Sequence, residues 1–259
     1  MSVKPIGIFD SGAGGLSIWR EISLLMPRES TAYISDAKYA PYGPRGKEAI
    51  IKRSIINTEK LLDMGAKIIV VACNTATTSA ITSLRKTYKV PFIGIEPAIK
   101  PAALATNTNK IGVLATKGTL SSALFYKTSK KYTQNKTMLE IEGKGIVELI
   151  ESGKLHSQEM KKLLMESLKP MLDIPIDCLV LGCTHYHFLI PILRELLPKH
   201  IRIIDSGLAV ARHTKFILKK KVLQNNSDKK GIHKFYTNGS VETMANLMGW
   251  KPTSINKTY

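Results

Sequence analysis

The sequence predicts an α/β fold of two pseudo-symmetric domains, each a mainly parallel sheet with helices on both faces. Two observations carry this prediction. Along most of the 259 residues, short apolar runs alternate with helix-length amphipathic segments, which is the pattern of parallel sheets connected by helices. In addition, an apolar run that ends in Cys73 has a counterpart that ends in Cys183, each followed by small polar residues. The two halves of the chain therefore share a design.

In the first half, four apolar runs are expected to form strands, at residues 5–10, 31–35, 67–72 and 91–95. The helices expected between them cover 16–26, 47–64 and 75–89. Leu16, Trp19 and Ile22 recur on one face of the first helix, and Gly65 ends the second. The run at 67–72 is almost wholly apolar, as in a strand that is buried on both faces.

Two glycine-containing segments in this half are candidate binding loops. The turn at 11–15 (SGAGG) leads from a strand into a helix, where backbone N–H groups can hold an anion. Its glycines also suit a plain tight turn. As a dinucleotide-binding fingerprint the turn is poor, because Ser17 stands where the third glycine belongs. The loop at 36–46 contains two prolines, two glycines and two tyrosines, and stiff loops of this kind often carry binding groups.

The second half repeats the alternation. Strands are expected at 110–115, 136–141, 177–182 and 202–204, and helices at 120–130, 143–152, 156–172, 189–197 and 208–221. Residues 223–231 are polar and predict a surface loop, and 233–250 are expected to return to the first domain. Residues 205–207 (DSG) repeat residues 10–12. We therefore expect a first domain of residues 1–97 and 209–259, and a second domain of residues 98–208.

The composition limits the functional classes. The net charge is +18, from 38 Lys and Arg against 20 Asp and Glu. Nucleic-acid binding stays open as an alternative to a solvated basic surface, although no aromatic residues alternate with the basic ones. No apolar run has the length of a membrane-spanning helix, and the first residues lack the apolar core of a signal peptide. Together with an odd cysteine count of three, this predicts a cytoplasmic protein with free thiols and no membrane association.

The cysteines at the two strand ends are the chemically informative residues. Ligands of open α/β sheets bind beyond the carboxyl ends of the strands, and the start of a helix is expected to lower the pKa of a thiol. A disulfide, a metal site at residues 183–187 (CTHYH), unreactive core cysteines and a single nucleophile remain alternatives. Two cysteines in matched positions fit a two-base reaction best, in which one thiol removes a proton and the other delivers one. Cys178 lies inside an apolar run and is expected to be inert.

Four stretches resemble the cofactor-independent aspartate/glutamate racemase family. They are residues 7–16 (GIFDSGAGGL), 41–43 (PYG), 73–76 (CNTA) and 181–186 (LGCTHY). They occur in the family's order and spacing and span nearly the whole chain. The opening motif and the PYG loop favour glutamate racemase over aspartate racemase. The resemblance implies an isomerase that interconverts L- and D-glutamate without pyridoxal phosphate or metal, supplies D-glutamate for peptidoglycan, and works as a homodimer with its active site in the cleft between two domains.

The resemblance also implies roles for particular residues. Cys73 is the expected base for the D-enantiomer and Cys183 for the L-enantiomer, with Asp10 and His185 assisting the thiols and Glu151 supporting the Cys183 side. The residues expected to bind substrate are Asp10, Ser11, Tyr42, Gly43, Asn74, Thr75, Thr116, Thr119, Thr184 and His185. Asp10 as a helix cap, His185 as a turn residue and His187 as a packing or surface residue are the plainer readings of the same positions.

Overall fold

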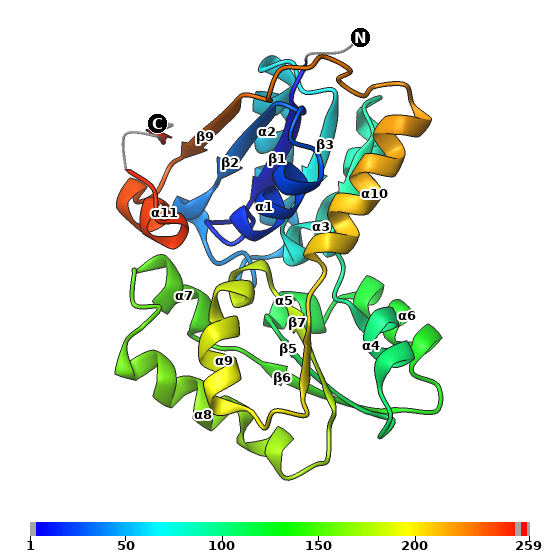
Figure 1. Ribbon diagram of the computed structural model, residues 1–259, viewed down its shortest axis with the longest axis vertical. Coiled ribbons are helices and arrows are strands. Elements are labelled where there is room, and N and C mark those ends of the chain that lie inside the picture. The colour runs from blue at the N-terminus through cyan, green and yellow to red at the C-terminus, as the bar shows by residue number, and fades with distance from the viewer. Residues whose placement is uncertain (1–3, 252–254, 258–259) are drawn as a thin grey trace.

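The computed structural model describes residues 4–251 and 255–257, and these form two parallel sheets stacked end to end (Figure 1). All pairings between neighbouring strands are parallel. The predicted fold class, parallel sheets with helices on both faces, is confirmed. Within these residues no helix has the length and apolar character needed to cross a membrane.

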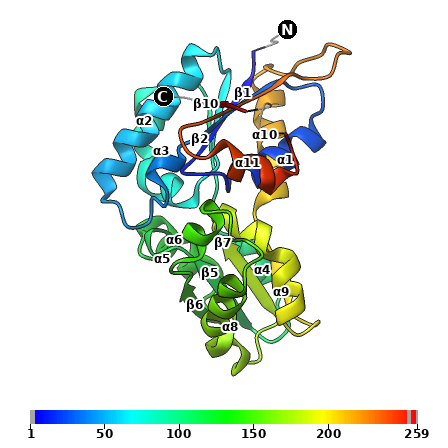
Figure 2. The same cartoon turned by 90° about the vertical axis from the view of Figure 1, so that its left-hand side faces the viewer.

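The first sheet has six strands in the order β10-β9-β2-β1-β3-β4. Its strands are β1 (Ile6–Asp10), β2 (Thr31–Ser35), β3 (Ile68–Val71), β4 (Phe92–Gly94), β9 (His233–Thr237) and β10 (Asn256–Lys257). Each of β1, β2 and β3 is buried at every position, because helices cover both faces (Figure 2). One face carries α1 (Leu16–Leu25), α10 (Gly207–Lys220) and α11 (Val241–Met248), and the other carries α2 (Lys47–Asp63) and α3 (Asn74–Thr87).

The second sheet has four strands in the order β6-β5-β7-β8. They are β5 (Lys110–Ala115), β6 (Thr137–Glu142), β7 (Cys178–Gly182) and β8 (Arg202–Ile204). One core of this sheet holds α7 (Ile146–Glu151), α8 (Gln158–Leu172), the 3-10 helix η2 (Thr184–Leu189) and α9 (Ile190–Leu196). The other holds α4 (Ile99–Ala105) and α6 (Ala123–Tyr132), with the short α5 (Lys117–Leu120) between β5 and α6.

The two sheets share a strand order. β2-β1-β3-β4 of the first sheet corresponds to β6-β5-β7-β8 of the second. β3 and β7 therefore occupy equivalent places, and Cys73 and Cys183 follow them directly. The repeated DSG triplet does not follow this equivalence, because residues 10–12 come after β1 whereas residues 205–207 come after β8, the counterpart of β4. The two sheets are related as predicted, but the two DSG triplets do not occupy equivalent positions in them and were wrong evidence for that relation.

Three elements differ from the sequence expectations. No helix was predicted at α4; its Pro101 lies in the first turn, where a proline is tolerated. Cys183 is followed by the 3-10 helix η2 rather than by a regular α-helix. The segment 233–250 returns to the first sheet as expected, but it does so as β9, which pairs with β2, and α11, and neither element was predicted. The proposed domain limits remain a prediction, and residues 1–3, 252–254 and 258–259 lie outside the described residues.

Candidate active site

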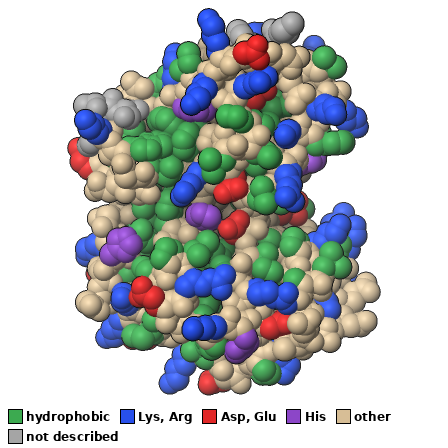
Figure 3. All heavy atoms as spheres, viewed as in Figure 1, with side chains coloured by type: hydrophobic (Ala, Val, Ile, Leu, Met, Phe, Trp, Pro, Cys, Tyr) green, Lys and Arg blue, Asp and Glu red, His purple; other side chains and the backbone are tan. Residues whose placement is uncertain are grey.

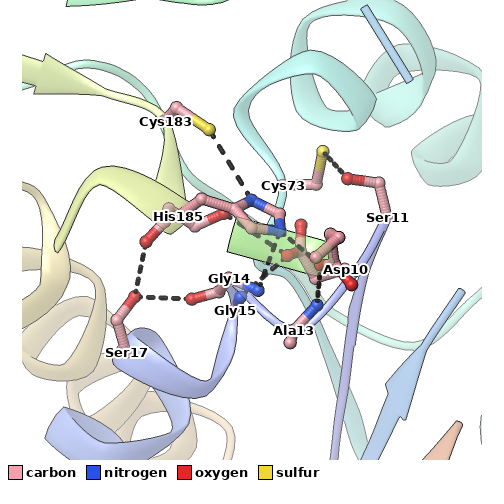
Figure 4. Close-up of polar contacts among 12 residues, drawn as sticks. Asp10, Ser11, Ala13, Gly14, Gly15, Ser17, Cys73, Cys183 and His185 are labelled. Atoms are coloured by element: carbon pink, nitrogen blue, oxygen red, sulfur yellow. Dashed lines mark hydrogen bonds and ion pairs between the residues drawn. The ribbon is translucent and has the colours of Figure 1, made fainter. Parts of the chain in front are cut away.

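Cys73 marks the start of α3 at the carboxyl end of β3. Its sulfur accepts a hydrogen bond from the backbone N–H of Ala76 (3.4 Å) and donates one to Ser11 Oγ (3.4 Å; Figure 4). The side chain is buried, and Ala72 before it continues the apolar core of the strand. The sequence placed this thiol correctly, directly before a helix, where it is the N-cap residue.

The expected effect of that helix start on the thiol is outweighed. Burial, together with the nearby negative charge of Asp10, raises the pKa of the Cys73 thiol above its ordinary value. The hydrogen bonds from Ala76 and to Ser11 act in the opposite direction. A helix start contributes about 0.3–1 kcal/mol, less than one pKa unit, whereas full burial shifts a pKa by up to about 3–5 units. The prediction of a lowered pKa is therefore wrong for Cys73, which is held as a neutral thiol.

Cys183 belongs to a chain of three side chains in the second half. His185 Nδ1 lies 3.7 Å from Cys183 Sγ (Figure 4). His185 Nε2 lies 2.6 Å from Glu151 Oε1. Glu151 is the last residue of α7, and His185 is in the first turn of η2. The structure therefore brings together the thiol and the two groups that were expected to assist it.

The His185 ring is the charged member of this chain. Burial lowers its pKa, but the hydrogen bonds to Cys183 and Glu151 and the charges of these two groups outweigh burial and raise the pKa well above its ordinary value. A protonated ring donates to Cys183 through Nδ1 and to Glu151 through Nε2. The cation can thus stabilise negative charge on the sulfur while its own charge is balanced by the carboxylate.

The glycine-rich turn holds carboxylates of the protein itself. The N–H of Ala13 donates to Glu151 Oε1 (2.6 Å), and the N–H of Gly15 donates to Asp10 Oδ2 (2.7 Å). The N–H of Gly14 approaches His185 Nε2 (3.2 Å), where it finds an acceptor only while that nitrogen carries no proton. The sequence predicted an anion site in this turn; the anions that occupy its N–H groups are side chains from both halves of the chain.

The glycines of this turn are required by the close approach of the second half. A Cβ on Gly14 would lie 2.6 Å from the backbone nitrogen of His185 and 2.4 Å from its Nδ1. A Cβ on Gly12 would lie 2.0 Å from Glu151 Oε1. At position 14 the obstructing atoms include backbone, so a side chain there displaces the His185 segment rather than a flexible side-chain end.

We expect Gly14→Ala to lower kcat/KM for the racemisation that the sequence resemblance implies by about 100-fold or more. The reason is that displacing His185 misplaces the group that supports the Cys183 thiol. Gly46→Ala is the matched control, since a Cβ at Gly46 meets nothing within 4 Å. Steady-state kinetics and circular dichroism of both variants check this. Equal activity of the two variants would show that the turn does not need to fit closely against His185.

Asp10 and Ser17 connect the first half of the site to Thr184. Asp10 is fully buried, and Thr184 Oγ1 donates to its Oδ2 (3.4 Å), whereas its Oδ1 has no hydrogen-bond partner among the described residues. Burial raises the pKa of Asp10, opposed by the positive charge of His185 and by the N–H of Gly15. Ser17 Oγ donates to the backbone oxygens of Gly14 (2.8 Å) and Thr184 (3.3 Å). Asp10 is therefore more than a helix cap.

A second polar group at the junction consists of three threonine hydroxyls. Thr75 Oγ1, in the first turn of α3, lies 2.9 Å from Thr116 Oγ1 and 3.4 Å from Thr119 Oγ1. Thr116 is the N-cap residue of α5. Asn74 precedes Thr75, and its buried Nδ2 has no hydrogen-bond partner among the described residues. These groups offer hydroxyl and amide donors beside the two thiols.

One small cavity collects most of the predicted residues. Its volume is about 10 Å³, which is room for about one water molecule. It is lined by residues of both halves, namely Ser11, Pro41, Tyr42, Gly43, Cys73, Asn74, Thr75, Thr116, Val147, Cys183, Thr184 and His185. Both thiols border this space, so the carboxyl ends of β3 and β7 face one another across it.

Comparison with known proteins identifies the family to which this arrangement belongs. The family model described as Asp/Glu/hydantoin racemase matches residues 20–214. The chain belongs to the Asp/Glu/hydantoin racemase family. A glutamate racemase from Stutzerimonas stutzeri is 44% identical over 245 residues, which is 94% of this chain and 92% of that protein.

Solved structures of the family have the same fold. The crystal structure of a glutamate racemase from Bacillus anthracis gives a TM-score of 0.86 at 29% identity, covering 100% of this chain and 97% of that one. The Escherichia coli glutamate racemase, solved in complex with L-glutamate and the activator UDP-MurNAc-Ala, gives a TM-score of 0.85 at 31% identity, with 98% of both chains covered. The predicted membership of this racemase family is thereby confirmed.

The predicted site residues form two groups according to whether they line the cavity. Ten of them border the cavity directly, whereas Asp10, Thr119 and Glu151 lie behind its wall and touch the lining side chains. Pro41 and Val147 border the cavity and were not predicted. Pro41 is part of the PYG loop and could have been included, but Val147 is an apolar residue of a helix without any sequence signal.

The alternatives for the cysteines resolve in part. Cys73, Cys178 and Cys183 are free thiols, so no disulfide joins them. Cys178 is fully buried within β7, as expected for an inert residue. His187 turns to Asp205 (Nδ1 to Oδ2, 3.1 Å) rather than to Cys183. Over residues 4–251 and 255–257, no three His, Cys, Asp or Glu side chains are grouped as metal ligands.

Figure 3 shows Lys and Arg side chains scattered over both halves of the visible face.

Proposed function

We propose that this racemase interconverts L- and D-glutamate by proton transfer at Cα between two cysteines. The observation that carries the proposal is the pair of thiols, Cys73 and Cys183, on the lining of a single cavity between the two sheets. Relatives at 44% identity are named glutamate racemases, and the solved Escherichia coli relative holds L-glutamate. Aspartate racemase is the alternative within the family, and nucleic-acid binding is the alternative that the charge of +18 suggests.

Racemisation needs a base on one face of Cα and an acid on the other. In the L to D direction, Cys183 as a thiolate removes the Cα proton, and Cys73 as a thiol delivers a proton to the opposite face. Burial favours the protonated form of Cys73, which suits the donor. The cationic His185 lies beside Cys183 and can donate a hydrogen bond to its sulfur. In the D to L direction the two residues exchange roles.

The Cα–H bond of an amino acid is a very weak acid, so the negative charge that develops must meet donors already in position. The Asn74 amide and the hydroxyls of Thr75, Thr116 and Thr184 border the cavity. Asp10 lies directly behind the cavity wall, and its Oδ1 has no hydrogen-bond partner among the described residues, so it is an acceptor suited to the ammonium group of a substrate that enters when the sheets separate. The PYG loop at 41–43 lies on the same cavity, and the backbone N–H groups of Tyr42 and Gly43 suit a carboxylate.

The wider setting follows from the family. We propose a cytoplasmic homodimer that acts on glutamate without pyridoxal phosphate or metal and supplies D-glutamate for peptidoglycan. The proposed domains are residues 1–97 with 209–259, and residues 98–208. The cavity of about 10 Å³ is smaller than a glutamate molecule, so substrate entry requires the two sheets to separate.

A racemisation assay tests the function. Purified protein is mixed with L-glutamate without added cofactor, and optical rotation is followed. We expect the magnitude of the rotation to fall to zero from either enantiomer, because the two have equal free energy. Aspartate should be turned over at least about 100-fold more slowly than glutamate. A static rotation with both enantiomers of glutamate, or faster turnover of aspartate, would contradict the proposal. DNA binding that persists at physiological salt would favour the nucleic-acid alternative.

A further inference from the structure

We propose that Asn238, in the turn between β9 and α11, is a positioning residue for substrate binding, because it fixes the loop that carries Tyr42 and Gly43. This inference rests on the proposed racemase function and adds a residue from the far end of the chain to it. Figure 1 shows β9 beside β2, with the β9–α11 turn close to the loop that follows β2. Nothing in the sequence around Asn238 indicates a role in the site.

Asn238 connects its turn to the start of the loop after β2. Its Nδ2 donates to Asp36 Oδ1 (2.6 Å), and its Oδ1 accepts from the backbone N–H of Lys38 (2.9 Å). The backbone N–H of Asn238 donates to the oxygen of Ser35 (3.3 Å). Gly239 permits this approach, because a Cβ there would lie 2.5 Å from Ala37 Cβ. Both polar ends of the Asn238 amide are therefore used on the same short segment.

Asp36 is the centre of the network and is fully buried. Arg53 of α2 donates to both of its oxygens, from Nε to Oδ2 (2.8 Å) and from Nη2 to Oδ1 (2.7 Å). Asn57 Nδ2 also donates to Oδ2 (3.3 Å). The remaining donor is Tyr42 OH, 2.5 Å from Oδ2. A buried carboxylate with this many donors is held in one position, and every group bonded to it is held with it.

Tyr42 connects the Asp36 network to the cavity. Its side chain is 1% exposed, and the residue borders the cavity together with Gly43. Because the hydroxyl is fixed by Asp36, the backbone of residues 42 and 43 is fixed at the cavity wall. A Cβ on Gly118, a residue of α5, would lie 3.1 Å from Gly43 Cα. The backbone at Gly43 therefore also fits closely against α5 of the second half. A small displacement of the loop would therefore change the substrate pocket directly.

The kinetic consequence follows from where the network acts. The hydrogen bonds of Asn238 to described residues go to Ser35, Asp36 and Lys38, none of which borders the cavity. Proton transfer is therefore affected only through substrate placement. We expect Asn238→Ala to raise KM for both enantiomers roughly tenfold, which is the loss of one hydrogen bond to a charged group, and to change kcat by less than about threefold. A purely structural role would lower thermal stability and leave KM unchanged.

Asn238→Asp provides a readout that a structural role would not move. It places a second carboxylate against Asp36. The charged groups that face the pair are Arg53 and Lys60 of α2, and the titratable group is the neutral phenol of Tyr42. Two adjacent carboxylates cannot both ionise without a penalty, and one shared proton removes it. We expect the KM ratio of Asn238→Asp to wild type to be larger at high pH, where both carboxylates ionise, than at low pH, where the pair keeps one proton.

The control is Asn246→Asp, which adds the same charge to an exposed position of α11; its KM ratio should stay near one at both pH values. Hydrogen exchange of a peptide covering residues 37–46 gives a measurement independent of activity, and we expect faster exchange in Asn238→Ala. Unchanged KM, a pH-independent ratio or unchanged exchange would overturn the inference while leaving racemisation intact. Failure of the wild-type protein to racemise glutamate would instead overturn the proposed function, and the exchange measurement would still decide whether Asn238 orders the loop.

Discussion

Replacing either catalytic thiol is expected to abolish racemisation. Cys73→Ala and Cys183→Ala each remove one of the two proton-transfer groups that border the cavity, and a positioned general acid or base contributes about 100- to 10,000-fold. We expect kcat/KM to fall at least about 1,000-fold in both directions for both variants. Initial rates from L- and D-glutamate, with circular dichroism to verify the fold, provide the measurement.

Cys178→Ala is the matched control for these two variants. Cys178 is also buried but lies inside β7, away from the cavity. Removing its sulfur is expected to cost about 1 kcal/mol of stability through the small void that it leaves, with kcat/KM within about twofold of the wild-type value. Near-normal activity in Cys73→Ala or Cys183→Ala would exclude the assignment of that residue as a base.

His185→Asn is expected to lower kcat/KM about 100-fold or more for both enantiomers. The variant keeps a polar side chain but removes the cation that lies between Cys183 and Glu151. Since L- and D-glutamate have equal free energy, the equilibrium constant is one in every variant, and kcat/KM must fall equally in both directions. The side of the defect therefore appears in the isotope effect rather than in the rates.

Substrate deuterated at Cα locates that defect. If His185 assists Cys183, the isotope effect on kcat/KM should grow for L-glutamate, which Cys183 deprotonates, and shrink for D-glutamate. His187→Asn is the control, because His187 bonds to Asp205 rather than to a thiol; its rates should stay within about threefold of wild type. Isotope effects that change equally for both enantiomers would place His185 outside the Cys183 step.

Much of the fold could be predicted from the sequence, because strands and helices leave local patterns. The runs that became β1, β3, β5 and β7 were apolar and of strand length, and parallel sheets bury such strands on both faces. The helix at Ile99–Ala105 was not predicted; it has only seven residues, with Pro101 in its first turn, and so leaves a weak local pattern. The DSG triplet at residues 205–207 was wrongly taken as the counterpart of residues 10–12, because a short motif carries no information about strand order.

The candidate site was predictable where a residue lies in a motif beside a strand end. Cys73, Cys183 and His185 are such residues, and the structure brings them to one cavity. The electrostatics were not predictable, because whether burial outweighs a helix start at Cys73 depends on the second half of the chain closing over it. The Asn238–Asp36 contact joins residues 202 positions apart, and no local pattern reports such a contact.

The two-base assignment is tested most directly by racemising L-glutamate in deuterium oxide and following deuterium at Cα in both enantiomers at early times. A proton taken by Cys183 stays on that sulfur, while Cys73 delivers deuterium gained from solvent. We therefore expect the first D-glutamate formed to carry deuterium at Cα, while the remaining L-glutamate keeps its original hydrogen. D-glutamate that retains the substrate hydrogen, or L-glutamate that gains deuterium as fast as product forms, would contradict the account.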